Sequence, residues 1–64
     1  MTKQELQEIT NRLNKRYYKK TGNRLVFREV LHKWYLCEMV PLGEQTLASG
    51  TLEECVAHAE NLAF

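Results

Sequence analysis

The chain has 64 residues, of which 44% are hydrophobic and 27% charged, a composition typical of a small folded domain and not of a disordered segment. No run of about 18 apolar residues is present, and the polar N-terminal stretch lacks the apolar segment of a signal peptide, so neither a membrane anchor nor secretion is expected. We therefore expect one small cytoplasmic domain over residues 1–64.

The formal net charge of +1 conceals a separation of charge along the chain. All nine lysines and arginines lie in residues 1–33 with three glutamates, which gives that half +6. Residues 34–64 contain five glutamates and no base, which gives −5. Such asymmetry predicts either an anionic partner or a polarised surface.

The first element is expected to be a helix that begins after Thr2 and ends at Gly22. Thr2 and Glu5 have the spacing of a capping box, in which each side chain accepts a hydrogen bond from the backbone N–H of the other residue. Gly22 suits the left-handed conformation that ends many helices. Apolar side chains recur at helical spacing and form one stripe, at Leu6, Ile9, Leu13 and Tyr17.

The end of this helix and the residues after it carry a dense cluster of bases. At about 100° per residue, the helical bases share an arc of about 140° beside the apolar stripe. Tyr18 is expected to project away from the stripe, where its ring can stack on a nucleic-acid base or on a side chain of a partner protein. Cations near a helix C-terminus also stabilise the helix, which is the alternative explanation for part of the charge. The candidate basic patch comprises Arg12, Lys15, Arg16, Tyr18, Lys19, Lys20, Arg24 and Arg28.

Residues 25–40 are rich in the β-branched and aromatic side chains that strands favour, and a break at residues 31–33 divides them into a hairpin. The break contains no Asn-Gly pair, so the length of the turn stays open. Residues 41–44, Pro-Leu-Gly-Glu, predict a second turn, and residues 45–49 a short third strand.

The last helix is expected to begin with a second capping box, formed by Thr51 and Glu54. An apolar stripe follows, at Leu52, Cys55, Val56, Ala59, Leu62 and Ala63. The order α-β-β-β-α predicts an α+β fold with both helices on one face of a three-stranded antiparallel sheet. This order is similar to that of double-stranded-RNA-binding domains in topology alone, because Leu52-Glu53-Glu54 places acid where that family carries lysine.

Two helices cover one face of such a sheet. The strands carry more apolar side chains than this face can hold, so large apolar side chains are also expected on the uncovered face. In the second strand the charge-free set is expected to face the helices, at Tyr35, Cys37 and Met39. Trp34, Leu36 and Val40 are then expected on the uncovered face as a contact surface for a protein. An even-numbered turn would exchange the two faces of the first strand relative to the second, and the sequence does not decide between an odd and an even turn. The alternative is that the first helix or residues 62–64 fold over this surface.

Side chains for catalysis are scarce, since the chain has no Asp and a single Ser. His32, Cys37, Cys55 and His58 lack the spacing of zinc-finger ligands, so no metal site is expected. The two cysteines are expected to be free and buried. Few residues remain to shape a substrate cavity, so we expect no enzyme activity, no cofactor and no small-molecule substrate.

These features predict a small, non-catalytic protein-interaction module in the cytoplasm. The expected partner is another protein or a second copy of the chain, with the sheet face as the contact and the basic patch steering the approach. The size and the charge separation are similar to those of small accessory or inhibitor proteins of phages. The alternative function is nucleic-acid binding through the basic end of the first helix, and no membrane partner is expected.

Overall fold

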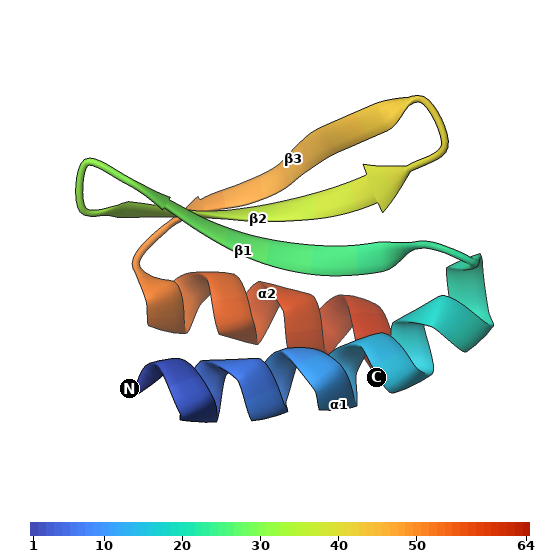
Figure 1. The fold of residues 1–64 in the computed structure, drawn as a ribbon, viewed down its shortest axis with the longest axis horizontal. Helices are drawn as coiled ribbons and strands as arrows, with labels where there is room; N and C mark the ends of the chain where they lie inside the picture. The colour runs from blue at the N-terminus through green and yellow to red at the C-terminus, as the bar shows by residue number, and fades with distance from the viewer.

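The computed structural model describes residues 1–64 and places two helices against one face of a three-stranded sheet (Figure 1). In chain order the elements are α1 (Lys3–Thr21), β1 (Arg24–Val30), β2 (Lys33–Val40), β3 (Gly43–Gly50) and α2 (Leu52–Ala63). The sheet is antiparallel with the strand order β1-β2-β3, so β2 is central. The predicted α-β-β-β-α order and α+β class are confirmed. Neither helix combines the length and the apolar composition that a membrane crossing requires.

The limits of both helices follow from local sequence. The Thr2 hydroxyl accepts from the backbone N–H of Glu5 at 3.1 Å, and the Glu5 carboxylate accepts from the N–H of Thr2 at 3.2 Å. Thr51 and Glu54 repeat this arrangement at 3.2 and 3.0 Å. Gly22 has a φ of 79°, in the left-handed region, and ends α1 as predicted.

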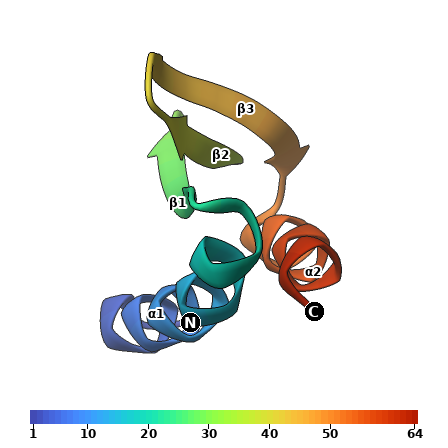
Figure 2. The same cartoon turned by 90° about the vertical axis from the view of Figure 1, so that its right-hand side faces the viewer.

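The two helices run in the same direction and end at the same end of the molecule (Figure 1). Each helix runs antiparallel to the strand next to it in sequence, and the three antiparallel strands between them reverse the chain twice. Figure 2 shows the helices side by side beneath the sheet. The negative ends of both helix dipoles therefore lie at one end, where Lys19 and Lys20 of the last turn of α1 also lie.

The core lies between the helices and the sheet. Its buried side chains are Leu13, Tyr17, Leu25, Leu36, Cys55, Ala59 and Ala63. The stripes predicted for the two helices supply most of this set, and β1 and β2 supply one leucine each. Leu36, in the central strand, is 0% exposed.

The prediction for the two faces of β2 was wrong. The turn between β1 and β2 has two residues, Leu31 and His32, with φ values of 51° and 65°. This even-numbered turn sets the register in which Phe27 lies opposite Leu36. In this register Leu25 and Phe27 share a face with Trp34, Leu36 and Val40, and this face packs against the helices, with Leu25 and Leu36 buried in the core.

Glu38 lies on the same face of β2 as Leu36, and its charge does not force this face toward solvent, because its carboxylate is buried and hydrogen-bonded. Glu38 is 7% exposed, and its carboxylate accepts hydrogen bonds from the Tyr17 hydroxyl at 2.7 Å, from Asn23 Nδ2 at 3.1 Å and from Gln45 Nε2 at 2.7 Å. The hydrogen bonds from Tyr17 and Gln45 lower the pKa of Glu38 against the opposing effect of burial. Burial and the hydrogen bond to Glu38 raise the pKa of Tyr17 to about 12. The charge is thus compensated by donors from three other segments.

Candidate functional site

The end of the molecule where both helices terminate carries a group of exposed bases, which we call the basic pole. It comprises Lys15, Arg16, Lys19, Lys20 and Arg24. The first four belong to the last turns of α1, and Arg24 opens β1. The N-terminal turns of both helices lie at the opposite end (Figure 1) and carry exposed glutamates, at Glu5, Glu53 and Glu54. These helix-terminal acids are therefore separated in space from the basic pole, whereas Lys3 lies at their end of the molecule and Glu60 lies near the end of α2.

Two bases of the pole stabilise the junction between the helices. Lys20 Nζ donates to the backbone carbonyl of Leu62 at 3.1 Å, and α2 has no base in its own last turn. The Arg16 guanidinium lies 4.6 Å from the ring centroid of Phe64. The alternative explanation, that cations complement helix ends, accounts for this part of the charge.

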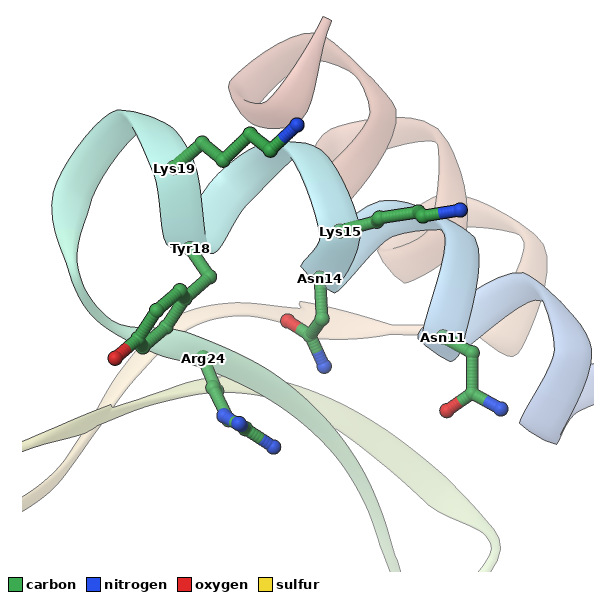
Figure 3. Close-up of a pocket in the computed structure, with 6 residues that line it drawn as sticks. All are labelled: Asn11, Asn14, Lys15, Tyr18, Lys19 and Arg24. Atoms are coloured by element: carbon green, nitrogen blue, oxygen red, sulfur yellow. The ribbon is translucent and has the colours of Figure 1, made fainter.

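A first hollow of about 330 Å³ lies between α1 and the start of β1 (Figure 3). Its lining residues are Asn11, Asn14, Lys15, Tyr18, Lys19 and Arg24. Figure 3 shows them along one stretch of α1 and at the adjoining end of β1. The hollow therefore contains three bases, two amides, one phenol and no acid.

The two amides of this hollow are held by hydrogen bonds that orient them. The Asn14 side chain donates to the carbonyl of Leu25 at 3.0 Å and accepts from its N–H at 2.6 Å, which pins α1 to the edge of β1. Asn11 Oδ1 accepts from Gln7 Nε2 at 3.0 Å. The Asn11 amide nitrogen thus remains free to donate, and the ammonium groups of Lys15 and Lys19 have no acid partner. The free polar atoms around the hollow, apart from the Tyr18 hydroxyl, are all donors, which suits an anionic ligand.

Tyr18 is exposed, consistent with its predicted projection away from the apolar stripe, and it lines this hollow. Its side chain is 52% exposed, whereas the neighbouring Tyr17 is 6% exposed and belongs to the core. The Arg24 guanidinium lies 5.3 Å from the Tyr18 ring centroid. The ring is therefore an exposed planar surface within the basic pole.

A second hollow of about 400 Å³ lies between α1 and the end of α2. Its lining residues are Arg16, Lys19, Lys20, Ala63 and Phe64. Lys19 borders both hollows, and Phe64 is 54% exposed. Sequence reasoning did not place Phe64 in the site. The odd number of strands was the available signal, because it makes the helices parallel and brings the end of α2 to the basic end of α1.

Two of the basic side chains in the predicted patch, Arg12 and Arg28, lie outside the pole. Arg28 projects from the uncovered face of the sheet and donates to both carboxylate oxygens of Glu44, at 2.8 and 2.6 Å. This pair crosses β2, where Cys37 lies on the same face and is 3% exposed. Arg12 is exposed on α1 and lines neither hollow. The inclusion of Arg28 in the patch is corrected, because its charge is neutralised by Glu44 of β3.

The sheet residues predicted as a protein contact do not form an exposed patch. Leu36 is fully buried, and Val40 is half-buried at the end of β2. Trp34 packs against the core, is half-buried and lines a third hollow between α1 and β1. The uncovered face instead exposes Val30 by 54% and Met39 by 44%.

The cysteines and histidines do not assemble into a site. Cys37 and Cys55 are free and buried, as predicted, and burial raises the pKa of the Cys55 thiol. No group of three or more His, Cys, Asp or Glu side chains could hold a metal ion. His32 lies in the β1–β2 turn and His58 on the exposed side of α2.

The fold and the site define a small α+β domain with a basic, donor-rich pole. Comparisons with protein-family models, with curated proteins and with solved structures found no match. Function is therefore inferred from the geometry and the charge of the pole.

Proposed function

We propose that this chain is a non-catalytic binding domain whose basic pole binds the phosphate backbone of a nucleic acid. The observation that carries the proposal is the donor-rich character of the first hollow, where Lys15, Lys19 and the Asn11 amide nitrogen are free. Phosphate oxygens only accept hydrogen bonds, and phosphate contacts supply most of the affinity in sequence-independent nucleic-acid binding.

The spacing of the donors supports a linear polyanion. Asn11, Lys15 and Lys19 follow one another at four-residue intervals on the same side of α1, which is about 6 Å of helix rise between neighbours. Arg24 adds a further base from β1. The glutamates at the opposite end repel a polyanion, so an approaching strand is steered to the pole.

The proposal places the protein in the cytoplasm. Cys37 and Cys55 are unpaired, and a reducing compartment keeps such thiols in that state. The proposed role needs no cofactor and no catalytic step. It requires only that the folded domain present its lysine and arginine side chains to the partner.

Reversing two charges of the pole tests the proposal. Lys15→Glu with Lys19→Glu is expected to weaken binding of a fluorescent oligonucleotide by at least about tenfold, because two phosphate contacts are lost and two repulsions are gained. Fluorescence anisotropy at several salt concentrations measures the affinity. For the wild type, log affinity should fall linearly with log salt, and the slope should be smaller in the variant.

Lys3→Glu with Lys33→Glu is the matched control, because it changes the net charge equally at exposed positions away from the pole. It should weaken binding by less than about threefold, the effect of a distant, screened charge. Equal losses in the two double variants would show that net charge alone attracts the oligonucleotide. That outcome, or no binding by the wild type, would contradict the proposal.

Protein interaction is the second candidate function, and the uncovered face of the sheet favours it, because this face exposes Val30 at one end of the β1–β2 pair and Met39 at the other. A second copy of the chain is the partner that is tested most directly. Sedimentation of the pure protein should then show a mass that rises with concentration. Met39→Glu should remove this rise, because it places a charge on the uncovered face. A monomer at every concentration would contradict self-association.

A further inference from the structure

Exposed aromatic rings at the basic pole indicate which kind of nucleic acid it binds. This inference rests on the proposed function. The chain has six aromatic side chains, one Trp, three Tyr and two Phe. Only Tyr18 and Phe64 are exposed, at 52% and 54%, and both lie at the pole. Neither exposed ring is part of the core.

The two rings have the same surroundings. Each has an arginine over one face, Arg24 at 5.3 Å from the Tyr18 centroid and Arg16 at 4.6 Å from the Phe64 centroid. Each ring borders one of the two hollows, and Lys19 borders both. The pole therefore presents one ring–arginine pair on either side of a free lysine.

A ring beside a guanidinium is a surface on which a nucleic-acid base can stack, since both groups are planar and the base supplies a π face. Bases can reach such a surface only when they are unpaired. In a duplex the bases are stacked on one another, and the pole would contact the backbone alone. We infer that the pole binds an unpaired nucleic-acid strand, with its phosphates on Lys15 and Lys19 and with bases stacked on Tyr18 and Phe64.

Three probes separate base stacking from phosphate binding. They are an oligothymidine of about 12 nucleotides, an abasic strand with the same number of phosphates, and a duplex of the same length. The wild type should bind the oligothymidine at least about tenfold more tightly than the abasic strand. Tyr18→Ala and Phe64→Ala should each reduce the affinity for oligothymidine by about tenfold and leave the affinity for the abasic strand unchanged.

Conservative variants distinguish a stacking role from a structural one. Tyr18→Phe and Phe64→Tyr keep a ring in place and should retain the affinity for oligothymidine. Unchanged binding of the abasic strand by the alanine variants shows that the pole is still folded. An equal loss for both strands would overturn the inference, because it would mean that the rings only support the fold of the pole.

The outcomes also separate this inference from the proposed function. If Lys15→Glu with Lys19→Glu weakens all three probes while the alanine variants leave oligothymidine binding unchanged, the pole binds phosphate and the stacking inference is wrong. If the double charge reversal changes the affinity for none of the probes, the proposed function fails and the inference fails with it. Wild-type preference for the duplex over oligothymidine would also overturn the inference.

Discussion

Replacing Leu36 with alanine is expected to lower the free energy of unfolding by about 2–5 kcal/mol. Leu36 is 0% exposed at the centre of β2, in contact with the core that both helices cover. Truncation removes buried apolar surface and leaves a cavity where neighbouring strands restrict relaxation. A domain of this size is stabilised by only about 3–5 kcal/mol, so a large fraction of the variant should be unfolded. Urea denaturation followed by circular dichroism measures the change.

Met39→Ala is the control for this prediction. Met39 lies in the same strand on the uncovered face and is 44% exposed, so its truncation should cost less than about 1 kcal/mol. The pair of variants therefore reports the register of the β1–β2 hairpin. A large loss for Met39→Ala with a small loss for Leu36→Ala would show that the opposite face of β2 packs against the helices.

Replacing Glu38 with glutamine is expected to lower the free energy of unfolding by about 1–3 kcal/mol at neutral pH. Both carboxylate oxygens accept hydrogen bonds, from Gln45 on one and from Tyr17 and Asn23 on the other. Glutamine presents an amide nitrogen in place of one oxygen, so at least one of the three donors loses its carboxylate acceptor. Urea denaturation measures the loss. Glu53→Gln, at an exposed position of α2, should leave the midpoint nearly unchanged.

The same substitution should change how stability depends on pH. The pKa of Glu38 in the folded chain lies below its ordinary value of 4.5, so the unfolded chain binds the proton more readily. The stabilisation is present above about pH 4.5 and is lost as the pH falls through the lower, folded pKa. Glu38→Gln should flatten this acid slope. The remaining slope comes from Glu5, Glu44 and Glu54, whose pKa values are lowered by hydrogen bonds. Equal acid slopes in wild type and variant would contradict the role given to Glu38.

The part of the candidate site that lies on α1 was predictable from helical spacing. The arc of bases and the outward direction of Tyr18 follow from the period of the helix, which the apolar stripe fixes in orientation. The contributions of other elements were not predictable in this way. Phe64 lies at the pole because the two helices run in the same direction. Arg28 lies outside the pole and forms an ion pair with Glu44 of β3.

Local interactions are what the sequence by itself determined about this protein. The capping boxes at Thr2 and Thr51, the left-handed Gly22 and the apolar stripes act within a few residues, and they established the order of the elements and the position of both helices. The tertiary structure alone decided which face of β2 is buried. Leu31 and His32 adopt a two-residue turn without the glycine or asparagine that usually marks it. Glu38 is buried because donors from distant segments compensate its charge, and such compensation depends on contacts that a pattern along one strand does not contain.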